Sequence, residues 1–596
     1  MTPPNEPDSP LGPLHRPTPT GVLARRFDQM FPVLSSAEID RVRRFGEVRR
    51  FGPGELLIRA GKPSPGMYVV LSGRLAVVSQ DPLGRSIPIA EFAQVVGGTL
   101  EEMEILPGEV LAEMGTLSGR PSALEVQAVE EVQAILVLPE QLRALLVEEA
   151  ELGERILRAL ILRHVALVET GFGGPVLIGP LRSPEVTRLS AFLARSGTPF
   201  RVVDPDADAE AAALVARYTP GDLPIVALPG GTLLKNPAKR DLARALGLVA
   251  RTLRSEPYDV AIVGAGPAGL ATAVYGASEG LSILVLEAMT FGGQAGASAR
   301  IENYLGFPTG VSGQALMARA FAQAQKFGAE FSLSTEVKQL DCVSESSGPD
   351  PVLILHLADG RQVRARAVVV ATGARYRRPE IRDLARYEGR GVSYWASPVE
   401  ARLCVDEDVA LIGGGNSAGQ AAVFLSGYAR TVRMLVRGSS LSSTMSAYLI
   451  DRIAALSNVS VLCETEIVEI SGEPDQGLHH VRWRNRRTGA EEEQVIPHLF
   501  VFTGADPVAR WLDGCGVPLD ERGFIRTGGE LRSTGVVPLP METSVDGIFA
   551  VGDVRSGSVK RVGGAIGEGA AVVAQLHAFL ARRGRAPTGR RRAETA

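Results

Sequence analysis

The fold of this 596-residue chain is decided by Tyr258-Asp-Val-Ala-Ile-Val-Gly-Ala-Gly-Pro-Ala-Gly-Leu-Ala-Thr-Ala273. An apolar run predicts a strand, and the Gly-x-Gly-x-x-Gly that follows predicts a tight turn into a helix. Glycines there let a pyrophosphate approach the backbone N–H groups at the helix N-terminus. The next strand ends in an acid that can accept both hydroxyls of an adenosine ribose. The candidate dinucleotide-binding residues are Gly264, Gly266, Pro267, Ala268, Gly269 and Glu287.

A second strand–glycine turn–helix begins at Val409-Ala-Leu-Ile-Gly-Gly-Gly-Asn-Ser-Ala-Gly419. The strand after it runs from Thr431 to Arg437, and it ends in arginine where an NAD site would carry an acid. An acid would repel a 2′-phosphate and a guanidinium can bind it, so this position favours NADPH over NADH. The alternative is that Arg437 is an ordinary surface charge. The candidate residues of this second site are Gly413, Gly415, Asn416, Ser417, Ala418 and Arg437.

Four further segments accompany the first fingerprint. They are Gly292-Gly-Gln-Ala295, Ile301-Glu-Asn-Tyr304, Ala367-Val-Val-Val-Ala-Thr-Gly-Ala374 and Gly547-Ile-Phe-Ala-Val-Gly-Asp553. As a set, from about residue 257 to 580, they resemble bacterial thioredoxin reductases. The resemblance implies FAD and NADPH as cofactors, a homodimer, and a helix beginning near residue 562 whose N–H groups face the flavin. The flavin-binding residues that it implies are Gly293, Gln294, Asn303, Thr372, Gly373, Gly552, Asp553, Arg561, Val562 and Gly563.

One segment departs from that family. Residues 391–400 read Gly-Val-Ser-Tyr-Trp-Ala-Ser-Pro-Val-Glu, where the reductases continue from Gly-Val-Ser-Tyr into Cys-Ala-Thr-Cys. Trp395 and Pro398 therefore stand at the two cysteine positions. Thiol–disulfide exchange needs a thiolate, which neither residue can supply. No catalytic acid or base is evident elsewhere, so the chemistry is left to the cofactors.

Residues 24–170 contain short strands punctuated by glycine, which predicts a small β-barrel flanked by helices. The segment Tyr68-Val-Val-Leu-Ser-Gly-Arg74 resembles cyclic-nucleotide-binding domains. The resemblance makes Glu113 the acid that accepts from the ribose 2′-OH, and it places Ser122 where the family has a phosphate-binding arginine. A serine offers one neutral hydrogen bond, whereas an arginine forms two charge-assisted hydrogen bonds to a phosphate. Weak binding of a cyclic nucleotide is therefore expected. The alternative is a regulatory or packing domain that has lost its ligand.

Residues 174–250 alternate as strand, helix, strand, helix, strand, strand, helix, which resembles a glutaredoxin or thioredoxin fold. Pro224 lies at the position of that family's cis-proline. The family's Cys-Pro-x-Cys falls on Ser183-Pro184-Glu185-Val186, so both cysteines are absent again. A docking or spacer role is expected for this thioredoxin-like insert.

The whole chain therefore reads as multidomain: a β-barrel with helices, a small thioredoxin-like α/β domain, and two Rossmann-like α/β domains. We place an FAD-binding domain at 257–378 and 497–580 and an NAD(P)H-binding domain at 379–496. Residues 1–21 and 582–596 are expected to be disordered. The net charge of −4 argues against a nucleic-acid partner. The four cysteines form no Cys-x-x-Cys, which suits the cytoplasm and gives no metal-site spacing. No membrane-length apolar run is found.

Three functions remain open at this point. The first is an FAD oxidoreductase that takes a hydride from NADPH and passes electrons to an acceptor, protein or small molecule, without a dithiol. Ferredoxin-NADP reductases of the same fold also lack the dithiol, which makes a one-electron protein acceptor reasonable. The second is a thioredoxin-disulfide reductase that uses another thiol route, with Cys404 the nearest cysteine in sequence. The third is a flavin-based redox or nucleotide sensor.

Overall fold

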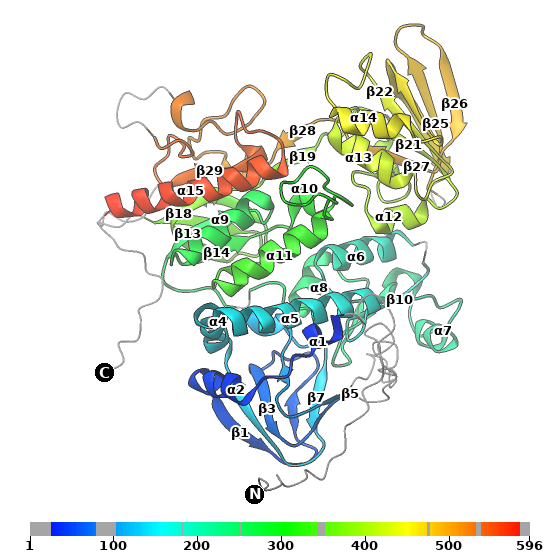
Figure 1. Cartoon of the computed structure of the whole chain (residues 1–596). Coiled ribbons are helices and arrows are strands. Elements are labelled where there is room, and N and C mark those ends of the chain that lie inside the picture. The colour runs from blue at the N-terminus through cyan, green and yellow to red at the C-terminus, as the bar shows by residue number, and fades with distance from the viewer. Residues whose placement is uncertain are drawn as a thin grey trace, which may run out of the picture. The chain divides into compact units, whose positions relative to one another are not determined.

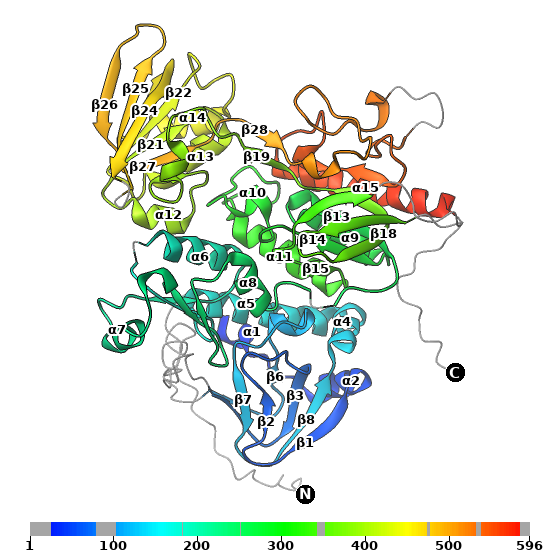
Figure 2. The same cartoon turned by 180° about the vertical axis from the view of Figure 1, so that it is seen from behind.

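The computed structural model describes residues 26–78, 103–181, 183–250, 252–341, 352–473, 477–531 and 538–583. The segments expected to be disordered, 1–21 and nearly all of 582–596, lie outside the described residues. The chain divides into two compact units. One comprises Met1–Val176, Pro199–Arg201 and Ala227–Leu233, and the other comprises Leu177–Thr198, Val202–Val226 and Leu234–Ala596. Figure 1 and Figure 2 label their helices and strands from two sides.

The N-terminal unit contains two four-stranded antiparallel sheets, as the glycine-punctuated strands predict. The strand orders are β1-β8-β3-β6 and β2-β7-β4-β5. Side chains alternate between the two faces of a strand, so Tyr68 and Val70 enter one apolar cluster and Met67 and Val69 enter another. The strands are β1 (Glu47–Phe51), β2 (Leu56–Ile58), β3 (Met67–Ser72), β4 (Leu75–Val78), β5 (Met103–Ile105), β6 (Val110–Leu111), β7 (Glu125–Ala128) and β8 (Val132–Val137).

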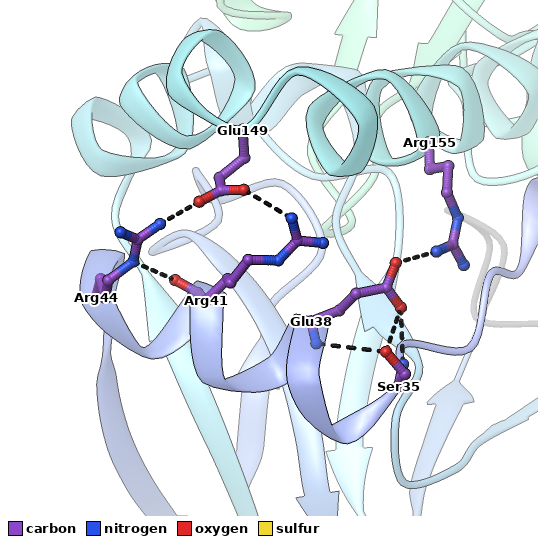
Figure 3. Close-up of polar contacts among 6 residues, drawn as sticks. All are labelled: Ser35, Glu38, Arg41, Arg44, Glu149 and Arg155. Atoms are coloured by element: carbon purple, nitrogen blue, oxygen red, sulfur yellow. Dashed lines mark hydrogen bonds and ion pairs between the residues drawn. The ribbon is translucent and has the colours of Figure 1, made fainter.

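The helices that flank these sheets are held together by ion pairs (Figure 3). Ser35 and Glu38 form a capping box at the start of the first of them, which satisfies two N–H groups that the helix leaves open. Glu149 lies between α4 and α5. Its carboxylate accepts hydrogen bonds from Arg41 in α2 and from Arg44, just after α2. The helices are α2 (Ser36–Val42), α4 (Pro139–Glu148) and α5 (Ala150–Thr170), and the ion pairs are Arg155–Glu38, Arg41–Glu149 and Arg44–Glu149.

The thioredoxin-like insert has the predicted order of elements, with strand order β10-β9-β11-β12 in its sheet. Ser183 caps its first helix by accepting from the N–H of Val186, and Pro184 occupies the first helical position. The Leu223–Pro224 peptide bond is cis, as the resemblance implies. The elements are β9 (Val176–Ile178), α6 (Pro184–Arg195), β10 (Arg201–Val203), α7 (Ala209–Val215), β11 (Ile225–Ala227), β12 (Leu233–Lys235) and α8 (Lys239–Ala245).

The first fingerprint lies in a seven-stranded sheet whose order is β15-β14-β13-β18-β17-β16, with β29 also paired to β18. The pairs β13–β14, β14–β15, β13–β18 and β18–β29 are parallel, so the loops after these strands meet at one edge. The strands are β13 (Tyr258–Val263), β14 (Ile283–Leu286), β15 (Glu330–Ser332), β16 (Val337–Asp341), β17 (Leu353–Leu357), β18 (Gln362–Val370) and β29 (Ile548–Ala550). The helices are α9 (Pro267–Ser278), α10 (Gly293–Gly296) and α11 (Gly313–Lys326).

The second fingerprint lies in a five-stranded parallel sheet of order β20-β27-β21-β22-β23, beside the antiparallel sheet β24-β25-β26. Here one boundary was wrong. The return to the FAD domain was placed at residue 497, but β27 pairs with β20 and β21 of this sheet, and the chain leaves through β28, which pairs with β19. A buried parallel strand is apolar throughout, so its sequence does not reveal which sheet it joins.

The bounds of this region are as follows. The strands are β19 (Ala374–Tyr376), β20 (Val392–Ser393), β21 (Asp408–Ile412), β22 (Thr431–Val436), β23 (Val459–Cys463), β24 (Thr465–Glu473), β25 (Gly477–Asn485), β26 (Glu491–Val495), β27 (His498–Val501) and β28 (Ala505–Pro507). The helices are α12 (Pro398–Leu403), α13 (Asn416–Leu425) and α14 (Ala447–Ala454).

The last described helix, α15 (Val562–Arg582), lies along α9 in Figure 1 and packs against it. By length and composition, it is the one described helix that could cross a membrane, with 39% of its most apolar window buried inside the protein. Its buried side chains, among them Val572, Leu576 and Phe579, give it the role of a core helix in the FAD domain.

Candidate functional site

The first glycine turn forms a cradle that a pyrophosphate fits. Gly264 has φ +112°, and a Cβ there would lie 2.3 Å from the carbonyl oxygen of Ala371. A Cβ on Gly269 would lie 1.9 Å from the Gly264 oxygen, so the helix can pack only if this residue is glycine. Gly266 is the N-cap of α9. Gly293 lies so close to it that a Cβ on Gly293 would be 3.1 Å from the Cα of Gly266. The glycines of this turn therefore put no Cβ over the N–H groups that α9 leaves open at its start.

Glu287 lies directly after β14 and braces this turn. Its carboxylate accepts from the N–H of Ala265 at 2.9 Å and from the N–H of Met289 at 2.8 Å. Burial raises the pKa of Glu287, and these two bonds together with the charges of Arg195 and Arg375 oppose the increase. The acid is thus placed at the strand end, where a ribose would meet it.

The segments expected to contact the flavin gather around the same edge of the sheet. Gln294 donates to the carbonyl oxygen of Ala374, and Thr372 donates to that of Val508 at 2.7 Å, so both side chains brace the loops. Gly373 has φ +65°. Asn303 is exposed in this structure.

The second FAD segment ends at Gly552 and Asp553. Burial raises the pKa of Asp553, and nearby Lys560 opposes the increase. Helix α15 begins at Val562 with Arg561 as N-cap, as predicted, and Gly563 is exposed in its first turn.

Sequence reasoning missed one acid beside this segment. Glu568 accepts from the N–H of Gly552 at 2.7 Å and pairs with Arg555, whose Nη2 lies 2.7 Å from its carboxylate. The pair fixes the turn that carries Asp553. The only feature of the sequence that could have indicated Glu568 is that it is an acid within an apolar helix.

The second glycine turn is built in the same way. Gly413 has φ +138°, and a Cβ there would lie 2.6 Å from the Phe502 oxygen. Ala418 is fully buried, and Gly415 caps α13. Asn416 accepts from the N–H of Ser446 at 2.8 Å, so its side chain holds the neighbouring loop. Arg437 is exposed just beyond β22.

Tyr376 connects the two dinucleotide sites. It lies in β19, one of the two strands that join the domains, and its ring meets Phe502 edge-on at 5.4 Å. Burial raises the pKa of Tyr376, the Ser417 hydroxyl opposes the increase, and the charge of Asp553 adds to it. The phenol is therefore near both the FAD segment and the start of α13.

The segment that the resemblance aligns with the family's dithiol forms a hydrogen-bonded helix start. Ser397 is the N-cap of α12 and forms a capping box with Glu400, and Pro398 is the first helical residue. The indole N–H of Trp395 donates to Glu400 Oε1 at 2.9 Å. The Arg195 guanidinium of the insert lies 5.3 Å from the centre of the same indole.

The cysteines that the structure describes lie outside the segment 395–400. Cys404 and Cys463 are free thiols, and Cys515 is disulfide-bonded and 8% exposed. Cys404 is fully buried, and burial, with a smaller effect of Glu400 and Glu407, raises its pKa to about 12. Cys342 lies outside the described residues.

In the N-terminal unit, Glu113 and Ser122 bind each other. The hydroxyl of Ser122 donates to Glu113 Oε1, and the N–H of Ala123 reaches the other carboxylate oxygen at 3.4 Å. Ser122 is 3% exposed and also accepts from the N–H of Leu124. The two residues assigned to a ligand thus satisfy one another within the loop.

Comparison with known proteins defines the class. Residues 258–569 match the pyridine nucleotide-disulphide oxidoreductase family, and residues 48–149 match the cyclic nucleotide-binding domain. A thioredoxin reductase of Peptoclostridium litorale is 33% identical over 329 residues, which are 54% of this chain and 97% of that protein. One from Mycolicibacterium smegmatis is 32% identical over 324 residues, 54% of this chain and 97% of that protein. The crystal structure of Lactococcus lactis thioredoxin reductase shares 29% identity, covers 55% of this chain and 99% of that one, and has a TM-score of 0.49.

The chain therefore belongs to the pyridine nucleotide-disulphide oxidoreductase family. It is a thioredoxin reductase-like flavoprotein oxidoreductase that depends on NADPH, with FAD as its second cofactor and a cyclic nucleotide-binding domain before the catalytic region. The predicted family, enzyme class and cofactors are confirmed.

Proposed function

We propose that this protein is an NADPH:FAD oxidoreductase whose electrons reach their acceptor without an active-site dithiol. The observation that carries the proposal is the bonding of Trp395 to Glu400 at the position where the family has its first cysteine. Pro398, at the second position, is the first residue of α12 and has no group that can be oxidised reversibly. When bound, FAD accepts a hydride from NADPH and passes the electrons on.

The chain's own residues bind and orient the two cofactors. We assign the FAD pyrophosphate to the turn from Gly264 to Gly269 and its adenosine ribose to Glu287. We assign the ribityl chain to Asp553, and the 2′-phosphate of NADPH to Arg437. Arg437 is exposed at a strand end, and within the described ranges no ion pair holds its guanidinium, which supports the last assignment.

A thioredoxin-disulfide reductase that uses a different thiol is the competing function. Cys404 is the free thiol nearest in sequence to residue 395, and its raised pKa keeps it protonated at neutral pH. A protonated, buried thiol cannot attack a disulfide. This favours an acceptor that takes electrons from the flavin itself, such as a one-electron protein or a small molecule.

The direct experiment is anaerobic titration of the purified yellow protein with NADPH, followed by a screen of acceptors. The screen includes thioredoxin, a one-electron carrier protein and a quinone. Rapid flavin bleaching by NADPH, with oxidation by a non-thiol acceptor, is the expected result. Turnover with thioredoxin alone would favour the competing function, and slow turnover with every acceptor would favour a flavin-based sensor.

We also propose that the N-terminal domain is a regulatory module that binds cyclic nucleotides weakly. The mutual bonding of Glu113 and Ser122 supports this, because a ligand would have to displace a hydrogen bond that the loop already makes. We further propose that the protein is a homodimer and acts in the cytoplasm. Light scattering of the purified protein tests the dimer.

A further inference from the structure

A pocket of about 190 Å³ lies at the carboxyl ends of β14 and β15, and two parts of the chain line it. The FAD domain contributes residues that follow these two strands, together with Ala358 and Asp359 of the turn after β17. The thioredoxin-like insert contributes one residue of α6 and two of α8. The lining residues on which the argument rests are Ala288, Met289 and Thr335 from the domain, and Phe192, Lys239 and Arg240 from the insert.

The place of this pocket in the sheet points to the adenine of FAD. Ala288 directly follows Glu287, the acid assigned to the adenosine ribose. In a dinucleotide-binding fold the pyrophosphate lies on the first helix and the ribose on the acid after the second strand, so the base lies beyond that acid. Thr335 follows β15, the strand next to β14, and it lines the pocket on that side.

The insert is anchored where it meets the pocket. The N–H of Leu333 donates to the Leu248 oxygen at 2.9 Å, which pairs the end of the insert with the segment after β15. Gln314 of α11 donates to the backbone oxygens of Ala194 and Arg195 at the end of α6. The insert is thus held at two points beside the pocket.

We propose that the thioredoxin-like insert closes the adenine end of the FAD site, with Phe192 as its apolar wall and with Lys239 and Arg240 as cofactor-binding residues. The proposal rests on the assignment of FAD to the 264–287 site. It gives the insert, which has no cysteines, a role in retaining the cofactor.

The chemistry of these three residues suits an adenine. Phe192 is 4% exposed and offers an apolar surface. Arg240 is positioned by Asp359, whose carboxylate lies 3.4 Å from its Nη2. Adenine ring nitrogens accept hydrogen bonds and its face is electron-rich, which matches a guanidinium and an ammonium. Burial lowers the pKa of Lys239, and the charges of Arg188 and Arg195 add to the decrease.

The test compares FAD with FMN, which lacks the adenosine. The full-length protein is stripped of cofactor, and the dissociation constants of FAD and FMN are measured by flavin fluorescence for the wild type, Lys239→Ala and Arg240→Ala. We expect each variant to bind FAD about 10-fold more weakly while its affinity for FMN stays unchanged. In Arg240→Ala, Asp359 still pairs with Arg361, so the substitution leaves no carboxylate without a partner.

Arg244→Ala is the matched control, because Arg244 lies on the same helix, pairs with Asp241 and does not line the pocket. Unchanged FAD affinity in both pocket variants would overturn the proposal, and so would equal losses for FAD and FMN. If Lys239→Ala fails to fold by circular dichroism, Lys239→Gln and Arg240→Ala carry the test. A wild-type protein that binds no FAD would instead overturn the assignment of the flavin site itself.

Discussion

Trp395 donates its indole N–H to Glu400 at 2.9 Å, within the capping box that starts α12. The same ring lies 5.3 Å from the guanidinium of Arg195 on the insert. A position that would carry a thiol in the thioredoxin reductases therefore carries a side chain that joins two parts of the fold. We infer that a structural contact occupies the place of the redox group.

Replacing Trp395 with Ala should destabilise the protein by about 2–3 kcal/mol, because it removes a hydrogen bond to a carboxylate and a cation–π contact. The reduction of the flavin by NADPH should remain, since neither dinucleotide site contains this residue. Urea unfolding followed by flavin release measures the first effect, and stopped-flow bleaching of the flavin absorbance measures the second.

Trp395→Phe separates the two contacts, because it keeps a ring near Arg195 and removes the donor. It should recover about 0.5–1 kcal/mol relative to the alanine variant. An alanine variant as stable as the wild type would show that the contact contributes nothing to folding.

Cys404 should resist alkylation between pH 7 and 9 (roughly the range in which an ordinary thiol ionises). Its pKa of about 12 keeps the thiol protonated throughout that range, and the thiolate would form only as the pH approaches 12. Iodoacetamide labelling with mass spectrometry checks this, with half-buried Cys463 as the internal comparison. If native Cys404 were labelled as fast as in urea, burial would not protect its thiol, and a thioredoxin-disulfide reductase that uses Cys404 would again be possible.

Arg437→Ala should raise the KM for NADPH about 10-fold or more and change that for NADH little, because only NADPH carries the 2′-phosphate. The matched control is Arg430→Ala, since Arg430 precedes the same strand and is already paired with Asp408 at 2.9 Å. An equal increase in the KM for NADPH and NADH would contradict the assignment of Arg437 to the 2′-phosphate.

Cyclic AMP should bind the full-length protein more weakly than micromolar. Ser122 cannot neutralise a cyclic phosphate, and Glu113 already accepts its hydroxyl. Isothermal calorimetry measures the binding. A micromolar or tighter complex would contradict the claim and would indicate that another cation, such as Arg120, binds the phosphate.

The sequence predicts most of this fold because its signals are local. The glycine turns at Gly264 and Gly413 have the positive φ that favours glycine, and the sequence predicts both turns without a structure. The order of elements in the insert and the position of Pro224 are readable for the same reason. The absence of cysteines at 395 and 398 is visible in the letters alone.

Contacts between distant segments are what the sequence does not reveal. Arg195 and Trp395 are 200 residues apart in number, and neither lies in a motif that predicts its partner. Lys239 and Arg240 look like ordinary charges at the start of a short helix, and only the fold brings them into one pocket with Ala288 and Thr335. The predicted return to the FAD domain at residue 497 is wrong because a single apolar run does not reveal which strands it pairs with.

We infer that electrons leave the flavin without a dithiol. The most direct test is anaerobic reduction of the enzyme by NADPH, followed by rapid mixing with oxidised thioredoxin and, separately, with a one-electron acceptor. We expect bleaching of the flavin by NADPH, reoxidation by the one-electron acceptor, and no thioredoxin reduction at about 1 s⁻¹ or faster. Fast reduction of thioredoxin, with new protein thiols in stoichiometric yield, would contradict it.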